Sequence, residues 1–235
     1  MAKPLVFLGW ESNIKRIYDI AVASGYEVAG LVDELQYNAY LSKTVSTIPV
    51  IGHPDTFFND PTVIDRFDFF LSYFFKTPTI LSMNANQLTW DRNRYIKTIN
   101  QLNLSCVSLI SPTAQISNTT KIGRGAYIGG NCVIGNYVTV GDFCQIHDNS
   151  LISNHSTIGN NTQIQRRVTF VGHTVIGDNC QIGLNTLFSN NYITVGDDAI
   201  IHSGYIIARD IAPGEIIHLT GKTLKKIYPA GRTIN

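Results

Sequence analysis

The feature that most constrains the fold of this chain is an apolar residue at every sixth position between residues 114 and 189, repeated thirteen times. A period of six fits neither an α-helix nor the simple alternation of a β-strand. It is typical of a hexapeptide β-helix, in which each hexad forms one short strand and one turn. The residues of the repeat are Ile116, Ile122, Ile128, Ile134, Val140, Ile146, Ile152, Ile158, Ile164, Phe170, Ile176, Ile182 and Phe188.

A second column supports this prediction, because a small or β-branched residue stands two positions before each apolar one. Three hexads complete one triangular coil, so residues eighteen positions apart are expected to stack on adjacent coils. After Phe188 the repeat shifts by one residue and resumes at Val195, Ile201 and Ile207. We therefore predict a left-handed parallel β-helix over residues 111–235, in which the segment that begins at Ile211 closes the open end as a C-terminal cap.

Residues 1–110 have a different pattern, in which apolar strands alternate with amphipathic helices. A buried strand that starts at Pro4 is expected to end at Gly9. A helix over residues 12–24 ends before Gly25, since glycine commonly terminates helices. A further helix is expected over residues 91–103. This alternation predicts an α/β N-terminal domain with a small, Rossmann-like parallel sheet.

The charge balance excludes some classes of partner. The chain has 18 basic and 17 acidic residues, so that neither a nucleic acid nor an anionic membrane is expected as its main partner. We find no signal-peptide pattern and no apolar run of the roughly 18 residues that a membrane span needs. We therefore expect a cytoplasmic protein that does not bind membranes.

The cysteines fit the same expectation. Cys132, Cys144 and Cys180 fall on the inner column of small residues, where a thiol packs as a small apolar side chain. They show no CxxC spacing, so neither a disulfide framework nor a metal site is expected.

An α/β unit of about 110 residues followed directly by a hexapeptide prism resembles the nucleotide-sugar acetyltransferases of the sialic-acid O-acetyltransferase and bacillosamine N-acetyltransferase type. The resemblance implies a homotrimer in which acetyl-CoA lies along the outside of the prism, between two subunits. It also implies that the N-terminal domain binds a nucleotide-linked amino sugar, whose amine attacks the thioester directly. The expected activity is N-acetylation of a nucleotide-linked amino-dideoxy sugar in surface glycan synthesis, such as that of the lipopolysaccharide O-antigen.

The family has a glycine-rich turn after its first strand, and the matching run here, residues 9–13, keeps only the first glycine. The resemblance implies that Gly9, Trp10, Ser12 and Asp33 bind the nucleotide substrate. The helix N-terminus after Gly9 favours an anion. Trp10 stacks on a nucleobase in one interpretation and packs in the core in the other. The G-x-G-x-x-G spacing of an NAD site is absent.

In the family, one turn of the prism carries a Glu-His-Asp-like triplet with the catalytic histidine, and the matching residues here are Ser153, Asn154 and His155. An imidazole, with an unperturbed pKa of ~6.5, takes up a proton near neutral pH, whereas an amide does not. Three hypotheses remain. His155 is the base, or His147 on a surface-facing position of the previous hexad is, or Asn154 only orients the amine and no protein base is needed. Asp148 is expected to orient either histidine by accepting a ring N–H.

His173 lies eighteen residues after His155, so the two rings are expected to stack on adjacent coils. With His147 they place three histidines within 27 positions of one expected groove. Such a stack also gives a metal-dependent alternative, because hexapeptide-fold carbonic anhydrases bind zinc through histidines at a trimer interface. That alternative leaves the α/β domain without a role.

The resemblance also implies residues for acetyl-CoA. The family threads the pantetheine past a small-residue turn and a glycine one coil later, and binds the adenine and 3′-phosphate with a C-terminal Gly-Asn-Pro-Ala-basic segment. The C-terminal run here keeps the glycine and the basic residues without the Asn-Pro. The corresponding residues are Val171, Gly172, His173, Gly183, Gly221, Lys222 and Lys225. Arg166 and Arg167 replace the usual turn residues and are candidates for a phosphate contact.

Other interpretations stand beside this one. Residues 76–90 either cover the substrate as a flap or form an irregular crossover. A sugar O-acetyltransferase is the nearest enzymatic alternative. Because Asn154 occupies the position of the family histidine, a non-catalytic binding or scaffold protein is the alternative from another class.

Overall fold

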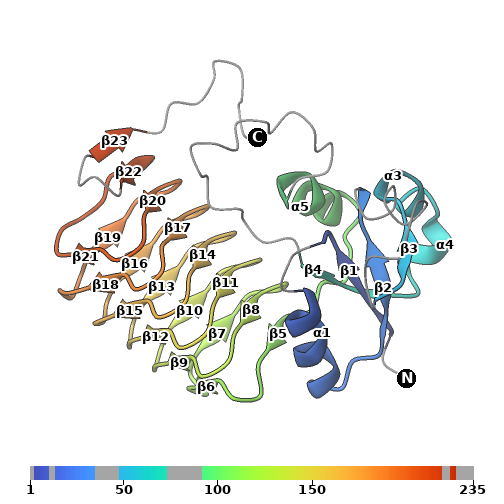
Figure 1. Cartoon of the computed structure of the whole chain (residues 1–235), viewed down its shortest axis with the longest axis horizontal. Helices are drawn as coiled ribbons and strands as arrows, with labels where there is room; N and C mark the ends of the chain where they lie inside the picture. The colour runs from blue at the N-terminus through green and yellow to red at the C-terminus, as the bar shows by residue number, and fades with distance from the viewer. Residues whose placement is uncertain (1–2, 11–13, 35–47, 73–91, 219–222, 226–235) are drawn as a thin grey trace. The chain divides into compact units, whose positions relative to one another are not determined.

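The computed structural model of the chain describes residues 3–10, 14–34, 48–72, 92–218 and 223–225, the last of these by backbone alone. The chain divides into two compact units, Met1–Pro112 and Thr113–Asn235 (Figure 1). Each unit buries its own apolar side chains. Within the described residues, no helix is both long and apolar enough to cross a bilayer.

The first unit is built on a parallel sheet with the strand order β3-β2-β1-β4. Its elements are β1 (Leu5–Leu8), α1 (Ile14–Ala23), β2 (Val28–Val32), β3 (Val50–Gly52), α3 (Pro54–Phe57), α4 (Pro61–Ile64), β4 (Asp68–Leu71), α5 (Arg92–Gln101) and β5 (Leu109–Ile110). All four strands of the sheet therefore end at the same edge, where the residues that follow them gather.

The sequence pattern explains these elements. In α1, buried residues recur three or four positions apart, as on one face of an amphipathic helix: Ile14, Ile17, Ile20 and Ala21. β1 buries all of its side chains, as a central parallel strand does. α5 buries Tyr95 and Ile99, and the Tyr95 hydroxyl donates to the carbonyl of Val32 at 3.2 Å.

The second unit is a three-sided prism, and each of its faces is one sheet. The chain winds through the three faces coil after coil, from green to red in Figure 1. The first face holds β6 (Gln115–Ile116), β9 (Val133–Ile134), β12 (Leu151–Ile152), β15 (Thr169–Phe170), β18 (Leu187–Phe188) and β21 (Ile206–Ile207). The second face holds β7 (Lys121–Ile122), β10 (Thr139–Val140), β13 (Thr157–Ile158), β16 (Val175–Ile176) and β19 (Thr194–Val195). The third face holds β8 (Tyr127–Ile128), β11 (Gln145–Ile146), β14 (Gln163–Ile164), β17 (Gln181–Ile182), β20 (Ile200–Ile201), β22 (Glu215–Ile217) and the antiparallel β23 (Thr223–Lys225).

The register of the prism follows the repeat. Residues eighteen apart pair in parallel, such as Leu151 with Thr169. From Ile128 to Phe188, the apolar residue of every hexad is at most 2% exposed. Phe170 and Phe188 meet edge to face at 4.8 Å between ring centroids. The predicted fold class, a small Rossmann-like parallel sheet followed by a left-handed parallel β-helix, is confirmed.

Each coil turns at three corners, which we number after the face that precedes them. One residue of almost every corner has a positive φ angle, and asparagine, which tolerates this conformation, is the most frequent. The non-glycine residues with this conformation are Asn131, Tyr137, Phe143, Asn149, His155, Asn161, Arg167, His173, Asn179, Asn185, Tyr192 and Asp198. The extra residue after Phe188 lies in the first corner, at 189–192, where Tyr192 takes the positive-φ position.

Polar side chains staple successive coils together at the corners. A staple is an Asp or Asn side chain that accepts a backbone N–H of the preceding coil. Asn154 Oδ1 accepts the N–H of Asn136 at 2.7 Å, and the second corner repeats this contact on successive coils. A Cβ at Gly135 would overlap the Asn154 Oδ1, so glycine makes room for the staple.

The described end of the prism is held by an ion pair. Glu215 is 6% exposed and pairs with Arg209 at 2.6 Å, and it also accepts the N–H of Ala212 at 2.8 Å. The hydrogen bond from Arg209 holds the pKa of Glu215 below its ordinary value. Ile211 bridges to Val195 of β19, so the chain after β21 stays against the last coil. The predicted cap extends beyond the described residues.

We expect the interior cysteines Cys132, Cys144 and Cys180 to be inert toward Ellman's reagent in the folded protein. Burial raises the pKa of Cys180 to about 12, so at about pH 8 its reactive thiolate is scarce. Absorbance of the released thiol should show all four cysteines reacting in guanidinium and at most one in the native protein. Fast reaction of two or more native cysteines would contradict this packing.

We also expect the Asn154 staple to contribute to stability. Asn154→Ala removes the acceptor of the Asn136 N–H and should lower the free energy of unfolding by about 1 kcal/mol, measured by urea denaturation. Asn154→Asp keeps an acceptor and should retain the stability, because aspartate serves as the staple elsewhere in this prism. Equal losses in the two variants would show that the staple does not stabilise the fold.

Candidate active site

The first corner brings several predicted residues together. Asn154 and His155 follow β12, and Gly172 and His173 follow β15. Because β12 and β15 pair in parallel register, corresponding corner residues lie on adjacent coils. His155 is exposed and His173 is half-buried, so both imidazoles reach the surface of the prism.

Four rings stack along this corner in the order Tyr137, His155, His173 and Tyr192, and we call them the ring ladder. Successive ring centroids are 5.0, 4.9 and 4.6 Å apart, with interplanar angles of 16°, 8° and 24°. The stack of His155 on His173 is the one that their spacing predicts. Our sequence analysis missed the two tyrosines, although Tyr137 precedes His155 by the same eighteen residues.

Two backbone N–H groups belong to the residues that directly precede His155 and His173 in the chain. At position 172 the chain has glycine, so no side chain reaches back to the N–H of Asn154 in the way that Asn154 reaches Asn136. Among the described residues, no acceptor bonds the N–H of Asn154 or of Gly172. Gly172 has a φ of 149°, a conformation that favours glycine. Fixed backbone donors of this kind can stabilise the oxygen of an acyl group during transfer.

Asn154, at the family's histidine position, serves the fold. Its Oδ1 is occupied by the N–H of Asn136, which leaves its Nδ2 hydrogens as donors. An amide side chain in this arrangement holds a corner and can orient a ligand, and it takes up no proton. The nearest imidazole in the sequence belongs to His155. This residue has a positive φ of 58° at the corner.

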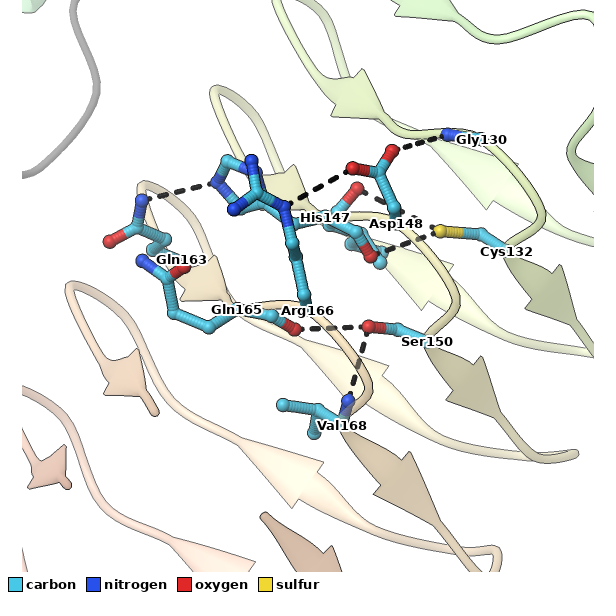
Figure 2. A network of polar contacts seen from close by, with 10 residues as sticks. Gly130, Cys132, His147, Asp148, Ser150, Gln163, Gln165, Arg166 and Val168 are labelled. Atoms are coloured by element: carbon cyan, nitrogen blue, oxygen red, sulfur yellow. Dashed lines mark hydrogen bonds and ion pairs between the residues drawn. The ribbon is translucent and has the colours of Figure 1, made fainter. Parts of the chain in front are cut away.

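His147 lies on the third corner, after β11, and is 5% exposed, so its predicted surface-facing position is wrong. Its Nε2 lies 3.2 Å from Nε2 of Gln163 (Figure 2). The centroid of its ring is 5.7 Å from that of the Tyr127 ring. An amide nitrogen only donates, so in this orientation His147 accepts at Nε2 and carries its proton on Nδ1. The lone pair that a base would use at Nε2 is therefore engaged.

Asp148, beside His147, is buried and committed to two other groups. Its Oδ1 staples the N–H of Gly130 at 2.7 Å, and its Oδ2 lies 3.3 Å from Nε of Arg166 (Figure 2). The guanidinium of Arg166 is partly exposed, so a cation anchored by Asp148 stands at the third corner. Asp148 and His155 lie on different corners, so within one chain this carboxylate does not orient the His155 ring.

Within a single chain, the three histidines do not all lie on one corner of the prism. Each hexad advances the chain by one face, so His147 falls on the third corner and His155, one hexad later, on the first. Only His155 and His173 lie on the same corner. A site that used both His147 and His155 would need two copies of the prism.

A polar column on the outer side of the third face was not predicted. Gln145 and Gln163 pair in register, are 1% and 2% exposed, and are joined by a hydrogen bond of 3.3 Å from Gln163 Nε2 to Gln145 Oε1. In the described part of the chain, Gln145 Nε2 has no hydrogen-bond partner. Glutamine at positions 145, 163 and 181 is the eighteen-residue signal that would have revealed this column.

In the first unit, predicted substrate residues gather at the carboxyl edge of the sheet. Gly9 follows β1 with a φ of 82°, and the N–H of Trp10 donates to Asp33 Oδ2 at 2.8 Å across the ends of β1 and β2. Ser72, which follows β4, donates to the carbonyls of Leu8, at 3.1 Å, and Gly9. The strand order reverses between β1 and β4, which is where α/β sheets bind ligands.

The Asp33 carboxylate changes what this edge can bind. It is 6% exposed and already accepts the first N–H after Gly9, a donor that an anion would otherwise use. Its charge also repels a phosphate placed directly on that N–H. Hydroxyl and N–H donors of a ribose or base suit a carboxylate at this place.

A separate groove of about 660 Å³ lies in the same unit between α3 and α5. Asp55, Arg94 and Lys97 line it, and Arg94 pairs with Asp55 at 3.0 Å. None of Gly9, Trp10 and Asp33 lines this groove, so it is distinct from the predicted nucleotide site.

The remaining residues that were predicted to bind acetyl-CoA or phosphate lie on different corners of the prism. Val171 is exposed on the first corner, whereas Gly183 lies on the third corner, where a Cβ would overlap the backbone of the next coil. Arg167 takes the positive-φ position of its corner.

Some predicted residues lie outside the described residues: Ser12, Gly221, Lys222 and the loop 76–90. Lys225 is described by its backbone alone, in β23. Over the ranges described, no group of three or more His, Cys, Asp or Glu side chains is arranged to hold a metal ion.

A family described as the GMPPB C-terminal domain matches residues 105–212, which run from the end of the first unit through most of the β-helix. No curated protein sequence matches the chain significantly.

Several solved structures share both units of the fold. PerB from Caulobacter crescentus, in complex with CoA and GDP-perosamine, has a TM-score of 0.74 at 18% identity over 94% of this chain and 97% of that one. The acetyltransferase domain of PglB from Neisseria gonorrhoeae FA1090 has a TM-score of 0.70 at 20% identity over 91% and 95%. WeeI from Acinetobacter baumannii AYE has a TM-score of 0.57 at 12% identity over 94% and 99%. The chain therefore has, over nearly its whole length, the two-part fold of these proteins.

Proposed function

We propose that this protein is an acetyl-CoA-dependent N-acetyltransferase that acts on the amino group of a nucleotide-linked amino-dideoxy sugar. The observation that carries the proposal is the match of both units, over 94% of the chain, to a structure that holds CoA and GDP-perosamine. A β-helix alone would be compatible with many functions. The second unit supplies an exposed imidazole beside two backbone donors, and the first supplies a polar sheet edge.

The reaction forms one bond and breaks one. The sugar amine attacks the carbonyl carbon of the acetyl thioester, a C–N bond forms, and the C–S bond breaks with its electron pair leaving on sulfur. The amine proton passes to a base, and the CoA thiolate is protonated as it leaves. Much of the rate enhancement in such a transfer comes from holding the two substrates in line.

We assign the base to His155 rather than to His147. The His155 ring is exposed at the first corner, and the N–H groups of Asn154 and Gly172, which have no acceptor among the described residues, would bind the thioester carbonyl oxygen. The His147 ring is buried and its Nε2 is engaged with Gln163. The alternative in which Asn154 only orients the amine requires that loss of His155 leave the rate unchanged.

Acetyl-CoA would lie along this corner, beside Val171, Gly172 and His173. Gly172 lets a pantetheine chain approach the backbone closely, since no side chain stands in its place. The predicted basic residues Lys222 and Lys225 would bind the phosphates. Gly183 has a packing reason of its own, so we give it a lesser part in cofactor binding.

The nucleotide would bind at the carboxyl edge of the sheet in the first unit. There Asp33 offers a carboxylate for the donors of the ribose or base, and Trp10 is half-buried beside it. Nucleotide sugars are water-soluble, and this fits a cytoplasmic enzyme that supplies a surface glycan pathway.

A homotrimer is the proposed assembly, and the first face supports it. Its outward side chains form an exposed apolar stripe, unusual for a prism face in water. Val133, Leu151, Leu187 and Ile206 are 40%, 39%, 36% and 68% exposed in the single chain. Packing this stripe on another face of the next copy gives a heterologous contact that closes as a ring. The same packing would bring the first corner of one copy toward another corner of its neighbour.

The first test is an acetyl-transfer assay that follows release of the CoA thiol, with mass spectrometry of the product. Acceptors are 3-amino and 4-amino sugars linked to UDP, dTDP and GDP. We expect transfer to one class, and a fall in kcat of about 10²-fold in His155→Gln, the lower limit for loss of a general base. Thr139→Gln, on the exposed second face, is the matched control.

Two results would redirect the proposal. Transfer to a sugar hydroxyl in place of the amine would favour an O-acetyltransferase, which depends more strongly on a base. The absence of acetyl-CoA binding in calorimetry at millimolar ligand would favour the non-catalytic scaffold.

A second prediction concerns the trimer. Leu187→Glu places a charge in the apolar stripe and should yield monomers by size-exclusion chromatography with light scattering. Val22→Glu, which replaces a similarly exposed apolar residue of α1, should remain trimeric. A wild-type protein that is monomeric at micromolar concentration would contradict the proposed assembly.

A further inference from the structure

The ring ladder departs from the pattern of the other corners. On the second and third corners the positive-φ position carries asparagine in five of eight non-glycine cases, at Asn131, Asn149, Asn161, Asn179 and Asn185, and Phe143, Arg167 and Asp198 in the other three. On the first corner the same position carries Tyr137, His155, His173 and Tyr192. Aromatic residues adopt this conformation at a cost in free energy that asparagine largely avoids. Strain of this kind is typical of functional positions.

The irregular coil keeps the ladder intact. The residue eighteen positions after His173 is Asn191, and the one-residue insertion puts Tyr192 in the stacked position instead. The Tyr192 ring then lies 4.6 Å from that of His173, although it is 72% exposed. Burial of apolar surface does not account for a tyrosine at such a place.

We infer that Tyr137, His173 and Tyr192 are positioning residues that hold the imidazole of His155 in one orientation. The inference rests on the proposed function and assigns the residues that support its base. A reactive histidine is usually oriented by a hydrogen bond from its second ring nitrogen to a carboxylate or a carbonyl. For the His155 ring, the contacts found among the described residues are the two rings stacked above and below it.

The geometry of the stack suits this task. The His155 ring is inclined by 16° to Tyr137 and by 8° to His173, so both of its faces are covered. Rotation of the imidazole about its own side-chain bonds would break both contacts. The ring edge, which carries both nitrogens, remains directed away from the stack. Ring stacking thus replaces hydrogen bonding as the means of orientation.

The consequence for the reaction is specific. Without Tyr137, the His155 imidazole has a neighbour on one face only and can rotate away from the amine. Misplacement of a reacting group lowers the rate of the chemical step without removing contacts to either substrate. We therefore expect kcat to fall while KM for acetyl-CoA stays unchanged.

The test compares Tyr137→Asn with Tyr137→Phe. Asparagine is the residue that this prism uses at equivalent positions, so it removes the ring without new strain, and phenylalanine keeps the ring without the hydroxyl. We expect kcat to fall about tenfold in Tyr137→Asn and to stay within about twofold of wild type in Tyr137→Phe, with KM for acetyl-CoA unchanged in both. Thermal melting of both variants identifies any loss of folded protein.

A spectroscopic measurement follows the ring itself. In protein labelled with ¹³C at histidine Cε1, the six histidines give six signals, and that of His155 is the one lost in His155→Gln. Ring currents from the flanking rings shift this signal upfield. We expect a downfield move in Tyr137→Asn and none in Tyr137→Phe.

The outcomes separate this inference from the proposed function. If acetyl transfer persists unchanged in His155→Gln, or if Tyr137→Asn matches wild type in kcat, the inference is overturned and the acetyltransferase stands. If Tyr137→Phe is as slow as Tyr137→Asn, the hydroxyl matters and positioning by stacking is overturned. If no nucleotide amino sugar accepts an acetyl group, both fall together.

Discussion

The pairing of each strand with the strand one coil before and after it is the constraint on which the second unit depends. These strands are two residues long for most of the prism, so no coil is stable alone and each is held by its neighbours in an eighteen-residue register. The register aligns the inner apolar residues into one core, and it equally aligns the corner residues into outer columns. A residue change at one corner is therefore felt by the coils on both sides. The staples and the ring ladder are both products of this alignment.

The repeat period was enough to predict the β-helix, its register and the stack of His155 on His173. It was not enough to predict the three-dimensional grouping of the site. Hexads that follow one another in sequence occupy different faces, so His147 and His155 are close in the chain and belong to different corners. The repeat also fails to predict which outward-facing side chains are buried, because it assigns every outward position to the surface. Gln145 and Gln163 occupy such positions and are buried.

The asparagine at position 154 illustrates how fold and chemistry compete for one position. A side chain there is within reach of the Asn136 N–H, and the amide oxygen that accepts this hydrogen bond stabilises the corner. The next residue has a positive φ and a side chain directed outward, away from the staples. An imidazole on that residue, His155, leaves the staple of the corner in place and, in the proposed mechanism, supplies the base. The orientation that a neighbouring carboxylate would otherwise supply must then come from elsewhere, and stacked rings on adjacent coils are available at this position.

In the first unit, the turn after β1 differs from a glycine-rich phosphate-binding turn because a carboxylate occupies one of its N–H groups. A glycine-rich turn that binds phosphate relies on several backbone N–H groups left open at a helix N-terminus. Here the N–H that follows Gly9 is occupied by the Asp33 carboxylate. A ligand at this edge gains most by donating hydrogen bonds to Asp33, and its phosphates are better placed away from that charge. At the proposed nucleotide site, such an arrangement would orient the ligand with its ribose or nucleobase toward Asp33 and its diphosphate toward cationic groups elsewhere. Under the proposed function, recognition of the ribose or nucleobase would select the substrate class, and the exposed corner of the prism would position the amine.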